Sequence, residues 1–161
     1  MQTSRDTPTS DDLFGLNQAL TAYCAGIDAK DYDLFRTAFA SEIQASYGEQ
    51  VGEFSGVDQL AVFMERLHRD LDFSLHRLSN FRVVEFDGSM AETESYLDAL
   101  LVRSGSSEGD TYRSQGIYTN RFRRQFDGWR ISVKEFRLLS ESGNPRIFAF
   151  DEARALIDAT A

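Results

Sequence analysis

The sequence predicts an α+β fold in which N-terminal helices pack on one face of a curved, mostly antiparallel sheet. Apolar residues recur at helical spacing through the first 70 residues and then alternate with polar residues over residues 73–139. Two Asp-Gly pairs, at 87–88 and 127–128, interrupt the alternating part where tight hairpin turns are expected. Helices that precede a meander of paired strands are typical of this fold class.

The first helix is expected to follow a disordered polar tail over residues 1–10 and to be capped by Ser10 or Asp11. Gly26 weakens the end of this helix, which places Asp28 at or just beyond the last turn. Residues 11–161 are expected to form a single domain.

The remaining elements follow from the same periodicities. Residues 48–56 (GEQVGEFSG) are expected to be a turn-rich connection. We expect further helices over residues 31–39, 57–70 and 151–159, a short strand over 43–47, and long strands over 73–86, 90–102, 111–126 and 129–139.

Composition excludes several classes of function. The chain has 161 residues, of which 42% are hydrophobic and 12% aromatic, enough for one domain with a substantial core. A net charge of −9 disfavours nucleic-acid binding. The basic residues Arg121, Arg123 and Arg124 are expected to form a solvated strand face.

Cysteine and histidine are scarce. A single cysteine, Cys24, leaves no internal disulfide and no multi-cysteine metal site, and the two separated histidines favour no metal either. The sequence contains no apolar run long enough for a membrane span or a signal peptide. We therefore expect a cytoplasmic protein without metal or cofactor.

Asp28 and His76 are the best candidates for chemistry. His76 opens a strand and Asp28 closes a helix, so the fold could bring a carboxylate against the imidazole. Such a carboxylate would orient the ring and raise its basicity, which gives a general base near neutral pH. The alternatives are a packed or capping histidine and a helix-end aspartate.

Four segments together resemble the SnoaL-like branch of the nuclear transport factor 2-like superfamily. They are YCAGIDAKDYDLFRTAFAS, GVDQLAVFM, HRLSNFRVVEFDGSMAETESYL and GIYTNRFRRQFDGWRISVKEF, which span roughly residues 11–140. The resemblance implies a cone-shaped α+β barrel, in which a strongly bent sheet wraps a helix and encloses a deep apolar pocket. Catalytic members of this superfamily include bile-acid 7α-dehydratase, the lindane dehydrochlorinase and scytalone dehydratase.

The first two of these enzymes carry an Asp at the end of the first helix and a His at the start of the first long strand. His76 follows Asp28 by 48 positions, which is similar to that pattern and implies that His76 is the base and Asp28 its partner. Tyr23 lies five residues before Asp28, as in the bile-acid enzyme, and its phenol could act as acid or oxyanion stabiliser. Tyr23 could equally be a core residue.

Other residues are candidates for lining the pocket. Tyr96, Tyr118 and Asn120 alternate on strands that should border the cone, and Lys134 could orient an anionic or carbonyl group. His68 is expected on the polar side of its helix, at the surface.

The leading hypothesis is a cofactor-independent lyase, of dehydratase type, that acts on a small apolar cyclic substrate such as a steroid, terpenoid or polyketide. An isomerase or polyketide cyclase could use the same pocket, with Asp98 as a weak candidate for the cyclase carboxylate. A non-catalytic subunit similar to the β-subunits of ring-hydroxylating dioxygenases is a further alternative, and a plain ligand-binding protein another. By resemblance we expect a homodimer or homotrimer.

Overall fold

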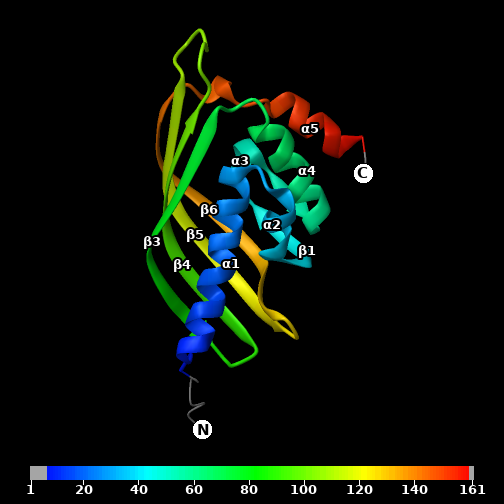
Figure 1. The fold of residues 1–161 in the computed structure, drawn as a ribbon, viewed down its shortest axis with the longest axis vertical. Helices are drawn as coiled ribbons and strands as arrows, with labels where there is room; N and C mark the ends of the chain where they lie inside the picture. Colours follow the sequence, from blue (N-terminus) through cyan, green and yellow to red (C-terminus); the bar gives the residue numbers. More distant parts are fainter. Residues whose placement is uncertain (1–6, 160–161) are drawn as a thin grey trace.

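Six strands form one bent sheet, and helices cover one of its faces (Figure 1). The computed structural model describes residues 7–159, without the side chain of residue 50. The helices are α1 (Ser10–Ala29), α2 (Tyr32–Thr37), α3 (Gly48–Val51), α4 (Val57–His68) and α5 (Phe150–Asp158), with a 3-10 turn at Pro145–Ile147. The strands are β1 (Phe39–Ser46), β2 (Glu53–Ser55), β3 (Phe73–Phe86), β4 (Met90–Val102), β5 (Thr111–Gln125) and β6 (Gly128–Gly143).

The strand order is β2-β1-β6-β5-β4-β3, and every neighbouring pair is antiparallel except the parallel pair β1 and β6. The predicted α+β fold with a mostly antiparallel sheet is therefore confirmed. Within residues 7–159 the edge strands β2 and β3 each pair with one strand, so the cone-shaped sheet is open at both edges and does not close into a barrel.

Several element boundaries differ from those predicted. β1 begins at Phe39 because its first residue already pairs with Ile131 of β6, a partner almost a hundred positions away that local sequence does not reveal. The connection over residues 48–56 contains α3 and β2 in place of turns alone, and β6 extends four residues beyond the predicted end at 139.

Irregular pairing bends the sheet around α1. The register between β3 and β4 shifts between Ser79 and Arg82, next to Asn80, whose φ of 53° lies in the left-handed region. A further shift occurs at Gly116, where an added Cβ would lie 2.3 Å from the carbonyl oxygen of Arg137. Glycine is required there because the two strands approach so closely.

The N-terminal cap of α1 is Thr9, not Ser10 or Asp11 as predicted. The Thr9 side chain accepts a hydrogen bond from the Asp12 backbone N–H, and the Asp12 carboxylate accepts from the Thr9 N–H in return. Asp12 also accepts from Trp129 of β6 at 3.3 Å, which ties α1 to the sheet. Of the expected tail, residues 1–6 lie outside the described residues.

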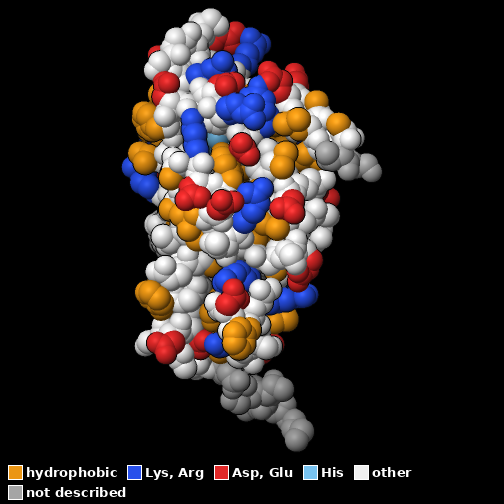
Figure 2. Space-filling view, turned by 45° about the vertical axis from the view of Figure 1, so that its right-hand side comes forward, with side chains coloured by type: hydrophobic (Ala, Val, Ile, Leu, Met, Phe, Trp, Pro, Cys, Tyr) orange, Lys and Arg blue, Asp and Glu red, His pale blue; other side chains and the backbone are white. Residues whose placement is uncertain are grey.

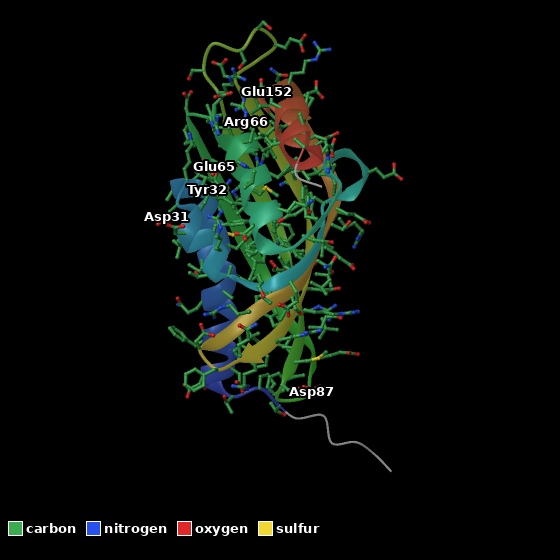
Figure 3. All side chains as sticks on the ribbon, turned by 90° about the vertical axis from the view of Figure 1, so that its right-hand side faces the viewer. Asp31, Tyr32, Glu65, Arg66, Asp87 and Glu152 are labelled. Carbon is green, nitrogen blue, oxygen red and sulfur yellow. The ribbon has the colours of Figure 1, made fainter. Side chains whose placement is uncertain are left out.

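α5 packs on α4 at one end of the helical layer. Glu152 of α5 pairs with Arg66 of α4, and both lie close together in Figure 3. Arg154 donates to the carbonyl of Val51 in α3. The C-terminal segment is thereby fixed over α3 and α4.

Charged side chains of both signs are interspersed over the surface shown in Figure 2, with apolar side chains between them. On the outer face of the sheet Arg121 pairs with Glu92 at 2.8 Å and Arg113 with Asp98 at 2.7 Å. Arg121 and Arg113 thus form ion pairs on the solvent side of the sheet, whereas Arg124, predicted for the same solvated face, pairs with Asp12 of α1 and lies over the Trp129 ring.

Candidate active site

The structure brings Asp28 and His76 together. Asp28 lies in the last turn of α1 and His76 near the start of β3, and Nδ1 of the imidazole is 2.7 Å from Oδ1 of the carboxylate. The other carboxylate oxygen accepts the backbone N–H of His76 at 2.8 Å. The Ser74 hydroxyl donates to Oδ1 at 2.8 Å. Three donors from one strand therefore converge on one carboxylate.

Lys30 holds the end of α1 against the segment that leads into β3. It is the C-cap of α1, with a left-handed φ of 56°. Its ammonium donates to the carbonyls of Leu71 at 2.6 Å and Arg69 at 3.1 Å. Because both carbonyls lie between α4 and β3, this side chain ties the end of α1 to the segment that leads into the strand of His76.

The hydrogen bonds define the form of the His76 ring. A carboxylate only accepts, so Nδ1 carries the proton and Nε2 is left with a free lone pair in the neutral ring. Burial alone would raise the pKa of Asp28, but the hydrogen bond and charge of His76, with the other two donors, lower it below its ordinary value. Asp28 is therefore ionised at neutral pH.

An apolar cavity of about 370 Å³ opens beside the His76 ring. Its size is in the range of small-molecule sites. Its lining combines many aliphatic and aromatic side chains with a few polar ones. The lining includes Tyr23, Ile27, Tyr47, Met64, Leu67, His68, His76, Leu97, Ala99, Leu101, Tyr112, Tyr118, Phe136 and Phe148.

Three tyrosine hydroxyls meet in the wall of this cavity. The hydroxyls of Tyr23 and Tyr118 are 2.9 Å apart, and the Tyr47 hydroxyl donates to that of Tyr23 at 3.3 Å. Burial raises the pKa of Tyr23 and Tyr118 well above the ordinary value, so both phenols stay protonated. Tyr23 and Tyr118 were predicted site residues, whereas Tyr47, which follows β1, lies in no motif that would indicate it.

Lys134 and Asn120 lie behind the tyrosines and do not line this cavity. Both are fully buried, and the Lys134 ammonium donates to the Asn120 side chain at 3.2 Å. The ammonium lies 3.3 Å from the centre of the Tyr118 ring and 4.1 Å from that of Tyr23. Burial lowers the pKa of Lys134 to about 7. Lys134 thus contacts the faces of two tyrosine rings that line the cavity, and Asn120 holds its ammonium in place.

Tyr96 does not face the cavity, contrary to the prediction. It is 52% exposed and pairs with Ile117, whereas its neighbour Ser95 pairs with Tyr118 and points inward. Successive residues of a strand face opposite sides, so Tyr96 and Tyr118 lie on opposite faces of the sheet.

His68 is not at the surface, contrary to the prediction. It is 4% exposed, it lines the cavity, and the centre of its ring lies 6.0 Å from that of His76. Its Nδ1 is 2.9 Å from the carbonyl oxygen of Met64, one turn earlier in α4. The site therefore contains two imidazoles, of which only that of His76 was predicted to be there.

Asp28 also lines a second, more polar hollow of about 400 Å³ between α1 and β3. His76 separates this hollow from the apolar cavity and contributes to both. Because Asp28 holds the Nδ1 edge of the ring from the side of the second hollow, the Nε2 edge is left for the apolar cavity.

Among the described residues, no cluster of three or more His, Cys, Asp or Glu side chains is placed to hold a metal ion. Within residues 7–159, no helix has the length and apolarity that a membrane span requires.

Known structures share this fold. An inferred aromatic ring hydroxylase from Novosphingobium aromaticivorans superposes with a TM-score of 0.78 at 21% identity, covering 88% of this chain and 99% of that one. An inferred scytalone dehydratase from the same organism gives 0.74 at 15% identity, with 82% and 87% covered. Hexachlorocyclohexane dehydrochlorinase LinA-type3 from Novosphingobium barchaimii gives 0.70 at 13% identity, with 83% and 90% covered.

Sequence comparison gives a family and no individual relative. Residues 9–135 match the profile of the SnoaL-like domain. No curated protein sequence matches the chain.

Proposed function

The chain belongs to the SnoaL-like domain family, and on that basis we propose that it is a cofactor-independent lyase of dehydratase type with His76 as general base. The observation that carries this proposal is the ionised Asp28 bound to Nδ1 of His76, 2.7 Å away, in the wall of an apolar cavity. A base with a fixed tautomer, a dry pocket and nearby hydroxyl donors are what an elimination requires.

In the proposed reaction Nε2 of His76 takes a proton from a carbon of the substrate. The electron pair of that C–H bond becomes a C=C bond, and the leaving group on the adjacent carbon departs with the electrons of its own bond. Asp28 stabilises the imidazolium that forms. A leaving hydroxide recovers the proton and departs as water, so one water is lost per turnover.

Tyr23 is proposed to assist the leaving group. Its ring centre lies 6.4 Å from that of His76, and its hydroxyl receives a hydrogen bond from Tyr47. Because its pKa is raised by burial, the phenol remains protonated and donates a hydrogen bond to the departing oxygen or to an activating carbonyl. Tyr118 shares this role through its hydroxyl contact with Tyr23.

The substrate is proposed to be a small, mostly apolar cyclic molecule such as a steroid, terpenoid or polyketide. The cavity walls are largely aliphatic and aromatic, and their polar side chains are those of the tyrosines, the two histidines, Ser114 and Glu49. The structural relatives described as scytalone dehydratase and as hexachlorocyclohexane dehydrochlorinase are named for acting on ring compounds.

An isomerase or polyketide cyclase would use the same base but would return the proton to another carbon or join two carbons. For a cyclase the sequence offered Asp98, but its carboxylate pairs with Arg113 on the outer face of the sheet. This placement favours His76 as the reactive group in each case. Release of a leaving group distinguishes elimination from both alternatives.

A second candidate function is that of a subunit that packs against other chains. Exposed apolar side chains on the outer face of the sheet favour it. Phe73, Leu75 and Tyr96 are 44%, 45% and 52% exposed there. We propose that this face joins copies of the chain in a homodimer or homotrimer. Light scattering on the purified protein and on the Tyr96→Lys variant tests this: the wild type should be oligomeric and the variant should dissociate, and a monomeric wild type would contradict the proposal.

General-base activity can be tested before the substrate is known. The probe 5-nitrobenzisoxazole opens when a base removes its ring C–H proton: the N–O bond breaks and a coloured cyanophenolate forms. We expect the protein to exceed free imidazole of equal concentration by roughly 100-fold, and His76→Gln to lose that excess. Folding of the variant is checked by circular dichroism.

Asp28→Asn gives a graded control, because it leaves the imidazole in place but removes the charge that supports it. Its rate should fall between those of the wild type and His76→Gln. A full rate in His76→Gln, or a wild-type rate no greater than that of free imidazole, would contradict the proposed function.

A further inference from the structure

We propose that His68 is a substrate-binding residue that accepts a hydrogen bond from a hydroxyl or N–H group of the ligand. The inference rests on the proposed function, because it assigns the apolar cavity beside His76 as the substrate site. It adds a chemical requirement to the substrate: a hydrogen-bond donor at the side of the molecule that faces α4.

The backbone fixes the orientation of the His68 ring. Nδ1 lies 2.9 Å from the carbonyl oxygen of Met64. A carbonyl only accepts, so Nδ1 carries the proton and Nε2 presents a lone pair. Within residues 7–159 no protein group donates to that Nε2, although the ring lines the cavity. An acceptor is therefore directed at the ligand space without a protein partner.

His68 stays neutral under ordinary conditions. Burial, with a smaller contribution from the neighbouring His76, lowers its pKa to about 4. A neutral ring with a protonated Nδ1 cannot donate from Nε2. It therefore selects for ligands that bring a donor and not for ligands that bring only a carbonyl or a halogen.

The two imidazoles have different tasks. The Asp28 carboxylate orients the His76 ring, whereas a neutral backbone carbonyl orients the His68 ring in an apolar wall. The centres of the two imidazole rings are 6.0 Å apart, and the centre of the Phe148 ring lies 6.3 Å from that of His68. A donor group bound to His68 would place the neighbouring ring carbons of the substrate beside His76.

The test compares two probes that differ by one hydroxyl, naphthalene and 2-naphthol, by measuring the dissociation constant of each. Two variants of His68 distinguish the roles of its two ring nitrogens. His68→Asn retains an amide near Nδ1 for the Met64 carbonyl but removes the acceptor at Nε2. His68→Gln places an amide oxygen near the position of Nε2. Thermal melts monitored by circular dichroism confirm that each variant is folded.

In His68→Asn we expect the dissociation constant of 2-naphthol to rise about three- to tenfold, the usual value of one neutral hydrogen bond. That of naphthalene should change less than about twofold, and His68→Gln should retain most of the wild-type preference. An equal change for both probes, or no change for either, would overturn the role of His68 and leave the proposed function intact. Failure of wild-type protein to bind naphthalene would instead contradict the cavity as a ligand site.

Discussion

Asp28 holds His76 at two points, because one carboxylate oxygen accepts the imidazole Nδ1–H at 2.7 Å and the other accepts the backbone N–H at 2.8 Å. The ring and the strand that carries it are thus fixed to the same group on α1. The imidazole cannot rotate without losing its partner, so the base is oriented before any substrate binds.

Asp28→Asn should lower kcat by roughly 10² to 10⁴-fold, because the amide neither holds the required tautomer nor stabilises an imidazolium. The folded state should persist, since the amide has nearly the same shape. Single-turnover kinetics with the elimination substrate measure this effect, whereas on the benzisoxazole probe the rate should lie between those of the wild type and His76→Gln. A variant with the full rate would show that the carboxylate is only structural.

Ser74→Ala is a matched change in the same cluster. It removes one donor, 2.8 Å from Oδ1 of Asp28, and leaves both contacts between Asp28 and His76 in place. We expect a loss in kcat of no more than about tenfold, as for one neutral hydrogen bond. A loss as large as that of Asp28→Asn would indicate that Ser74 itself contacts the substrate.

Tyr118→Phe and Tyr96→Phe remove the same hydroxyl from opposite faces of the sheet. The Tyr118 hydroxyl contacts that of Tyr23 at 2.9 Å, so its loss should lower kcat by about 10- to 100-fold through the missing donor. Tyr96 is 52% exposed on the outer face, and its variant should match the wild type. Steady-state kinetics of both variants test the assignment, and equal effects would contradict it.

Gly26→Ala should destabilise the protein although alanine favours helices. A Cβ at this position would lie 2.6 Å from the backbone nitrogen of Phe35 and 2.7 Å from its Cα, so α2 must move. We expect a loss of about 1–3 kcal/mol in the free energy of unfolding, measured by urea titration. The exposed Gln18→Ala in the same helix is the control and should change it by less than about 0.5 kcal/mol.

Local patterns were sufficient to predict some elements. β3 and β4 begin and end where alternation and the Asp-Gly turn at 87–88 placed them, at residues 73–86 and 90–102. β1 and β2 could not be predicted in this way, because their extent depends on pairing with each other and with β6. Such pairing follows from tertiary contacts and not from a local period.

Two placements predicted for the site were wrong, those of Tyr96 and His68, although the sequence contained patterns that indicate the correct ones. Tyr96 shares the parity of Glu94 and Asp98 in its strand, so it belongs to the charged outer face. His68 lies four residues after Met64 and eight after Leu60, which places it on the apolar stripe of α4. The burial of Lys134 had no comparable signal, because it depends on the two tyrosine rings that cover its ammonium.

Lys134→Met should remove part of the pH dependence of stability. The pKa of Lys134 is lowered from 10.5 to about 7 in the folded state, so above pH 7 the unfolded chain binds one more proton. The wild type should therefore gain stability from about pH 7 to about pH 8.5, by at most about 1.4 kcal/mol per pH unit. Urea titrations of both proteins across this range measure the difference.

In Lys134→Met the free energy of unfolding should change less with pH than in the wild type. Identical slopes for the two proteins would contradict a buried Lys134 ammonium that titrates in this range. The range ends below pH 9 because the pKa of Cys24 is raised from 9.0 to about 12, and above pH 9 its contribution to the slope opposes that of Lys134. There the unfolded thiol loses its proton while the folded thiol keeps it.

His68→Asn should change the acid side of the same profile. Burial lowers the pKa of His68 from 6.5 to about 4, so the unfolded chain binds more protons between these values. The wild type should lose stability as pH falls through this interval, by at most about 1.4 kcal/mol per unit, and His68→Asn should lose less. Asp12 does not affect this comparison. Its pKa is lowered from 3.8 to about 2, so the stability that it contributes is lost only at lower pH. Parallel profiles for the two proteins between pH 4 and 6.5 would show that His68 charges as readily in the folded protein as in the unfolded chain, against its burial in the cavity wall.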